Sequence, residues 1–196
     1  LLARLKKARV PLPGGCAIGV RPVNIHLKGF EALGAKVSID GGCAVATADK
    51  LVGSSIILDF PSVGATENLM MAASLAEGKT VMENCAQEPE IVDLAKFLNR
   101  MGAKIEGAGS PTITINGVEK LGGGTYAIMP DRVEAGTFAI LGAMTKGSIS
   151  IENCEPNHIM ALINKLREMG AEVSIFENSL TVKATKALKA IEAKTL

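Results

Sequence analysis

Apolar residues recur three or four positions apart in three stretches of the chain, the spacing of an amphipathic α-helix. Each stretch starts just after a proline and is followed by a glycine, Gly34, Gly102 or Gly170. A glycine there suits the left-handed conformation that commonly closes a helix. The apolar positions of the three predicted helices are Val23, Leu27, Phe30 and Leu33; Ile91, Leu94, Leu98 and Met101; and Ile159, Ile163, Leu166 and Met169.

A short alternating stretch follows these helices, as in Val37-Ser38-Ile39 and Val173-Ser174-Ile175. Alternation of this kind predicts a half-buried strand. Gly41-Gly42 and Glu177-Asn178 come next, and each predicts a hairpin turn to a partner strand.

The helix-to-strand junction is itself repeated. Leu33-Gly34-Ala35-Lys36-Val37 recurs at Met101–Ile105 and again at Met169–Val173, at intervals of 68 residues. Glu83-Asn84-Cys85 recurs as Glu152-Asn153-Cys154. A unit of 68 residues exceeds the common solenoid repeats, so the repeat favours a pseudo-symmetric α/β domain.

Two further helices are predicted at about 65–77 and 133–146, and both are rich in Ala, Gly and Ser. Helices made of small, largely apolar residues let neighbouring helices pack closely against them, so we expect helices in the centre and sheets outside. The last stretch, 183–196, permits either a weak helix or a strand followed by a linker.

Composition narrows the class of protein. Apolar residues make up 47% of the 196 residues and aromatic residues 3%, which predicts an aliphatic core. A net charge of +1 gives no reason to expect nucleic acid or an anionic membrane as partner. No apolar run reaches the length of a membrane helix.

The four cysteines form no CxxC pair, which argues against a zinc site or disulfides and for a reducing cytoplasm. A start without Met and an end without a closing signal suggest a fragment.

The segment 11–22 is rich in proline and glycine and therefore predicts a loop. It places a thiol, Cys16, five positions before a guanidinium, Arg21, at the start of a helix. An arginine there suits a phosphate or diphosphate. A loop cysteine alone is more often merely tolerated, and no Walker lysine is present. Cys85 and Cys154 occupy equivalent repeat positions and are expected in the core.

Five motifs, in order, resemble the UDP-N-acetylglucosamine 1-carboxyvinyltransferase family of enolpyruvyl transferases. The resemblance spans essentially the whole chain. It is carried by Leu12–His26, Asp59–Asn68, Glu88–Asp93, Leu121–Gly124 and Pro130–Phe138.

This resemblance implies an α/β fold, an inside-out barrel of repeated βαβαββ units with buried helices and exposed sheets. The family has two such domains of three units each. Residues 1–129 would then belong to the domain that carries the catalytic loop, and residues 130–196 to the first unit of the other domain.

The resemblance also implies the reaction. The family transfers the enolpyruvyl group of phosphoenolpyruvate to the 3′-hydroxyl of UDP-N-acetylglucosamine and releases phosphate, without metal or organic cofactor. This is the first committed step of bacterial peptidoglycan synthesis. Cys16 matches the position that protonates phosphoenolpyruvate, can bind it covalently and is alkylated by fosfomycin. A thiol suits both roles.

Further site residues are carried over by position. Arg21, Pro22, Val23, Asn24 and Ile25 match the stretch that lines the UDP-sugar site, where some relatives have Asp for Asn24. Ser62, Val63 and Gly64 match a second segment that holds the nucleotide sugar, although Ser62 also suits a plain helix cap.

Four more residues have weaker support. His26 is a candidate neighbour of the uracil ring, or a structural histidine. Glu88, Asp131 and Arg132 match charged positions near the cleft, although Glu88 and Asp131 could instead pair with local cations.

The resemblance leaves out part of the site. The family uses Lys, Arg and Asp residues from flanks that this sequence does not contain, so we expect the 196-residue piece alone to be inactive. One alternative is a related transferase acting on shikimate 3-phosphate, which lacks the loop around Cys16. Another is a non-catalytic UDP-sugar-binding paralogue with the same fold. The sequence predicts no oligomeric state.

Overall fold

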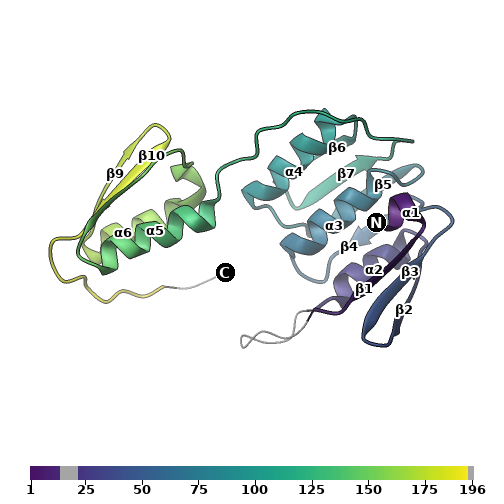
Figure 1. Cartoon of the computed structure of the whole chain (residues 1–196), viewed down its shortest axis with the longest axis horizontal. Coiled ribbons are helices and arrows are strands. Elements are labelled where there is room, and N and C mark those ends of the chain that lie inside the picture. Colours follow the sequence, from purple (N-terminus) through teal and green to yellow (C-terminus); the bar gives the residue numbers. More distant parts are fainter. Residues whose placement is uncertain (14–21, 194–196) are drawn as a thin grey trace. The chain divides into compact units, whose positions relative to one another are not determined.

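The computed structural model describes residues 1–13 and 22–193. The chain forms two compact units, Leu1–Ala127 and Ile128–Leu196. Figure 1 shows the helices and strands of each unit. No helix in the described part of the chain is long and apolar enough to cross a membrane.

The first unit contains two sheets. One has the order β1-β3-β2 and is antiparallel throughout, and the other has the order β4-β5-β7-β6 with only β4 and β5 parallel. The elements of this unit are α1 (Leu2–Leu5), β1 (Lys7–Pro11), α2 (Asn24–Ala32), β2 (Lys36–Asp40), β3 (Cys43–Thr47), β4 (Ser55–Ile57), α3 (Val63–Ala73), β5 (Lys79–Glu83), α4 (Pro89–Arg100), β6 (Lys104–Glu106) and β7 (Thr112–Asn116).

Helix α3 lies between α2 and α4 and packs against both (Figure 1). Gly29 of α2 permits the close approach, because a Cβ there would lie 2.3 Å from Cδ1 of Leu69. Strands β1 and β2 are largely exposed, whereas α3 is largely buried. The expected arrangement, with helices inside and sheets outside, is confirmed in this unit. Its largest fully buried apolar side chains are Leu33, Leu58, Leu69, Met70, Met82, Ile91, Ile113 and Ile115.

The second unit has one antiparallel sheet, in the order β8-β10-β9. Its core joins Ala135, Ala139 and Ala143 of α5 to Ile163 of α6 and Leu180 of β10. The elements are α5 (Arg132–Met144), β8 (Ser148–Ile151), the 3-10 helix η1 (Pro156–Ile159), α6 (Met160–Met169), β9 (Glu172–Phe176) and β10 (Ser179–Lys183). Strand β10 ends at Lys183 and residues 184–193 form neither helix nor strand, so the weak helix is not present in the described part of the tail.

The predicted ends of α2, α4 and α6 are confirmed. Gly34, Gly102 and Gly170 have φ of 89°, 103° and 101°, in the left-handed region that glycine adopts without strain. Gly41 and Gly42 also have positive φ and form the predicted hairpin turn between β2 and β3.

Candidate functional site

The loop segment with the predicted catalytic thiol is mostly outside the described part of the chain. Cys16 and Arg21 both lie outside it. Pro22 and Val23 lead into α2, with Val23 as the residue that caps its N-terminus. Asn24 and Ile25 form the first helical positions, and Ile25 is buried in the core.

Ser62, Val63 and Gly64 form the start of α3. Ser62 caps this helix, because its Oγ accepts a hydrogen bond from the backbone N–H of Ala65 at 3.3 Å. Its extended backbone, at φ −97° and ψ 119°, is the usual conformation of such a cap. The N–H groups of the first helical positions have no acceptor within a helix, so this turn also suits an anionic ligand.

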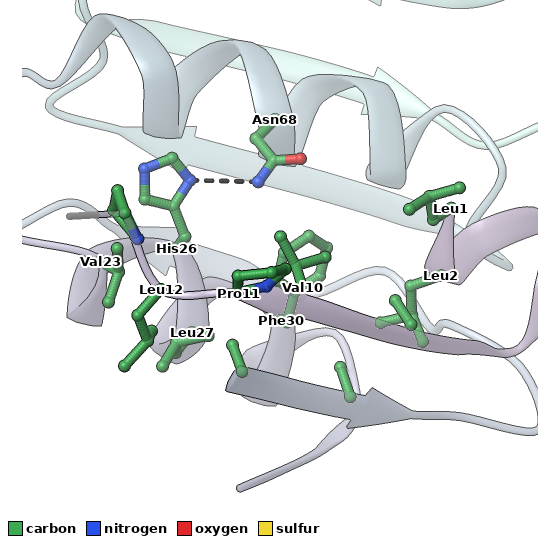
Figure 2. A pocket seen from close by; sticks show the side chains of 14 residues that line it. Leu1, Leu2, Val10, Pro11, Leu12, Val23, His26, Leu27, Phe30 and Asn68 are labelled. Atoms are coloured by element: carbon green, nitrogen blue, oxygen red, sulfur yellow. Dashed lines mark hydrogen bonds between the residues drawn. The ribbon is translucent and has the colours of Figure 1, made fainter. Parts of the chain in front are cut away.

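The first turn of α3 meets α2 at His26. A Cβ at Gly64 would lie 3.7 Å from Cε1 of the His26 ring. One helical turn further on, Nδ2 of Asn68 lies 3.1 Å from Nδ1 of the same ring (Figure 2). The structure therefore brings His26 and the Ser62–Gly64 turn together.

An ion pair joins the same two segments. Nζ of Lys28, on α2, lies 2.7 Å from Oδ2 of Asp59, which precedes α3. Both side chains are more than half exposed, so the pair contributes little to stability. It does place a charge of each sign beside the start of α3.

A cavity of about 380 Å³ lies beside His26, between α2, β1 and β3. Figure 2 shows its lining, which is apolar among the described residues apart from His26 and Asn68. Burial in these surroundings lowers the pKa of His26, because the apolar environment disfavours the charged ring. This shift favours the neutral ring, in which one nitrogen donates a hydrogen bond and the other accepts one.

Glu88 caps the N-terminus of α4 with its backbone and makes no capping bond through its side chain. The loop just before it is tied to α3, because the backbone N–H of Ala86 donates to Oγ1 of Thr66 at 3.1 Å. In α3, Glu67 has a raised pKa, first because of burial and second because of the charge of Glu90.

Asp131 and Arg132 belong to the second unit. Asp131 caps α5, with its Oδ1 accepting hydrogen bonds from the N–H groups of Val133 at 2.7 Å and Glu134 at 3.2 Å. These bonds make Asp131 a helix cap, a role that the sequence analysis did not assign to it. Arg132 is the first helical residue of α5.

Two of the remaining cysteines are core residues, as predicted. Cys85 is 1% exposed and Cys154 is 3% exposed. Burial raises the pKa of the Cys85 thiol to about 11. No group of three His, Cys, Asp or Glu side chains within residues 1–13 and 22–193 has the arrangement of a metal site.

Asn68 is the residue of this site that the sequence did not single out. It lies within the Asp59–Asn68 motif and four positions after Gly64, hence on the same helical face. The spacing of four residues from Gly64 is the sequence pattern that could have identified Asn68.

Residues 1–196, the whole chain, match one protein-family model, which is described as EPSP synthase (3-phosphoshikimate 1-carboxyvinyltransferase). Two solved structures share the fold. The enolpyruvyl transferase NikO from Streptomyces tendae has a TM-score of 0.79 at 22% identity, over 96% of this chain and 46% of that one. An EPSP synthase from Acinetobacter baumannii has a TM-score of 0.66 at 20% identity, over 96% and 45%.

Curated relatives resemble the chain more strongly in sequence. UDP-N-acetylglucosamine 1-carboxyvinyltransferase 2 of Carboxydothermus hydrogenoformans is 57% identical, and enzymes named UDP-N-acetylglucosamine 1-carboxyvinyltransferase 1 are 54% identical in Caldanaerobacter subterraneus and 56% in Staphylococcus aureus. Each match covers 100% of this chain and 47% of the relative. The chain thus spans about half the length of these relatives.

Proposed function

The chain belongs to the EPSP synthase family, and on that premise we propose that the protein containing it is a UDP-N-acetylglucosamine 1-carboxyvinyltransferase. This enzyme would move the enolpyruvyl group of phosphoenolpyruvate to the 3′-hydroxyl of UDP-N-acetylglucosamine and release phosphate. The product would enter peptidoglycan synthesis in the cytoplasm. The observation that carries the proposal is the high identity, along the whole chain, to relatives of that name.

Cys16 is the proposed proton donor. Its thiol would protonate the methylene carbon of phosphoenolpyruvate while the sugar hydroxyl oxygen bonds to the neighbouring carbon, giving a tetrahedral ketal. Loss of phosphate, and of a proton from the methyl group, then restores the carbon–carbon double bond on the sugar. The flanking glycines leave room for the substrate to approach the thiol.

Two segments are proposed to hold the nucleotide sugar. The first is 21–25, in which Arg21 would pair with the diphosphate as a bidentate donor. The second is the Ser62–Gly64 turn, where the helix N-terminus favours negative charge. The approach of His26 to Gly64 supports a single site, because it joins α2 to the start of α3. Glu88, Asp131 and Arg132 are supporting residues in this proposal.

We place residues 1–129 in the domain with the catalytic loop and residues 130–196 in the first unit of the second domain. The residues expected to hold phosphoenolpyruvate and to act as base at the sugar hydroxyl lie outside these 196 residues. The 196-residue chain is therefore expected to be inactive alone.

A release assay for phosphate tests the proposal. The protein that contains this chain should release phosphate from phosphoenolpyruvate only when UDP-N-acetylglucosamine is present, and Cys16→Ala should lose that activity. Release with shikimate 3-phosphate instead would assign the related transferase. Binding of UDP-N-acetylglucosamine without release would assign the non-catalytic paralogue. Robust release by the 196-residue chain alone would contradict the expected need for flanking residues.

A further inference from the structure

Asn68 projects from α3 onto the ring of His26 in α2 (Figure 2). The amide nitrogen Nδ2 of Asn68 lies 3.1 Å from Nδ1 of His26. An amide nitrogen donates hydrogen bonds and accepts none, so Nδ1 must supply the lone pair. The single proton of the neutral ring then resides on Nε2.

The other edge of the ring lies beside the first turn of α3. A Cβ built on Gly64 would be 3.7 Å from Cε1 and 4.0 Å from Nε2 of His26. Gly64 and Asn68 share one face of α3, so the same helix binds one ring nitrogen and flanks the other. The Nε2–H group is thereby placed next to the N–H groups that open α3.

The charged groups around the ring do not oppose a neutral imidazole. Among described residues, the lining of the adjacent cavity carries no carboxylate. On α2, Lys28 is paired with Asp59. Burial is the cause of the downward shift in the pKa of His26, and no carboxylate of the described residues contributes to it.

We propose that Asn68 is a positioning residue that holds His26 in the Nε2–H tautomer, so that His26 donates a hydrogen bond to an acceptor oxygen of the bound nucleotide sugar. The ligand in this statement rests on the proposed function. The tautomer rests on the contact between His26 and Asn68 alone.

Nitrogen NMR of the chain labelled with ¹⁵N-histidine tests the tautomer directly. The sequence has two histidines, His26 and His158, so His26→Gln assigns the signals. Wild-type His26 should show the Nε2–H pattern above its pKa. Asn68→Asp keeps the side-chain shape but accepts from Nδ1, so it should invert the tautomer and raise the pKa of His26 by about 1 unit or more. An Nδ1–H tautomer in the wild type would overturn the inference.

Calorimetric binding of UDP-N-acetylglucosamine to the protein containing this chain tests the ligand contact. Asn68→Asp should raise Kd about tenfold, the usual effect of one lost hydrogen bond. Asn68→Thr, whose hydroxyl can donate to Nδ1, should keep both the tautomer and most of the affinity, and thermal denaturation checks that each variant is folded.

The two experiments separate the two claims. Unchanged affinity in a folded Asn68→Asp variant with an inverted tautomer would overturn the positioning role. A wild-type protein that shows the Nε2–H tautomer but binds no nucleotide sugar would instead contradict the proposed function.

Discussion

The hydroxyl of Thr66 links the first turn of α3 to Ala86, in the loop that precedes α4. It accepts a hydrogen bond from the backbone N–H of Ala86 at 3.1 Å and donates one to the carbonyl of Ser62 at 2.8 Å. Thr66 is fully buried. The Ser62–Gly64 turn, which we propose holds the nucleotide sugar, and the loop before Glu88 are thus fixed to each other by one side chain.

Thr66→Val should therefore destabilise the chain by about 1–3 kcal/mol, since it leaves the buried N–H of Ala86 without an acceptor. Hydrogen exchange at the Ala86 amide reports the contact itself. Exchange should accelerate in Thr66→Val and stay slow in Thr66→Ser, which keeps the hydroxyl. Equal exchange in the two variants would show that the hydroxyl does not hold this loop.

Gly117 marks a close approach of two backbones. A Cβ at this position would lie 1.6 Å from the carbonyl oxygen of Ala76, just after α3. Gly117→Ala must displace backbone and should lower the free energy of unfolding by about 3 kcal/mol or more. Gly123→Ala is the matched control, because a Cβ there meets no atom within 4 Å. Chemical denaturation compares the two, and equal stability would contradict the close approach.

The buried thiols should resist alkylation. Burial raises the pKa of Cys85 to about 11 and also raises the pKa of Cys154, so both stay protonated at pH 8. A maleimide should modify the partly exposed Cys43 faster than either of them, and peptide mass spectrometry locates the adducts. Urea should abolish the difference. Rapid native labelling of Cys85 would contradict its place in the core.

Tyr126 is the only tyrosine of a chain without tryptophan, so its ionisation is visible in absorbance. Its hydroxyl donates to Oδ1 of Asp93 at 2.8 Å, and its ring lies 5.1 Å from that of Phe97. Burial, and then Asp93, raise the pKa of Tyr126, so its titration midpoint should lie above 10.

Asp93→Asn should lower this midpoint, because the carboxylate no longer accepts the phenol proton or repels the phenolate. Glu31→Gln, at an exposed carboxylate on α2, is the control and should leave the midpoint unchanged. An unshifted midpoint in Asp93→Asn would mean that Tyr126 does not contact Asp93.

The presence of helices α2 to α6 could be predicted from the sequence. The ends of the helices could be predicted only where a single residue type determines them. Gly34, Gly102 and Gly170 were recognisable because the left-handed closing residue is nearly always glycine. The expected end of α5, residue 146, is too late. Lys146 has a φ of 53°, in the left-handed region, and a lysine gives no sequence signal for that conformation. The end of α3 was also placed too late. There, Ser74 Oγ donates to the carbonyl of Met70, and the following turn tightens.

The site was predictable only in part. Ser62 as a cap follows from local chemistry, and it is confirmed. The pairing of His26 with Asn68 depends on how α2 packs against α3, 42 residues apart in sequence, and no periodic pattern contains that information. The role of Cys16 came from the resemblance, because a thiol in a glycine-rich loop has no distinctive local signature.

Intact mass after fosfomycin treatment tests the central claim most directly. The protein that contains this chain should gain one adduct, located on the peptide with Cys16, and gain it faster when UDP-N-acetylglucosamine is present. Cys16→Asp should gain none at that peptide. Modification only at Cys43 or another thiol, or no UDP-N-acetylglucosamine effect at Cys16, would contradict the assignment of Cys16 as the reactive thiol of a nucleotide-sugar enolpyruvyl transferase.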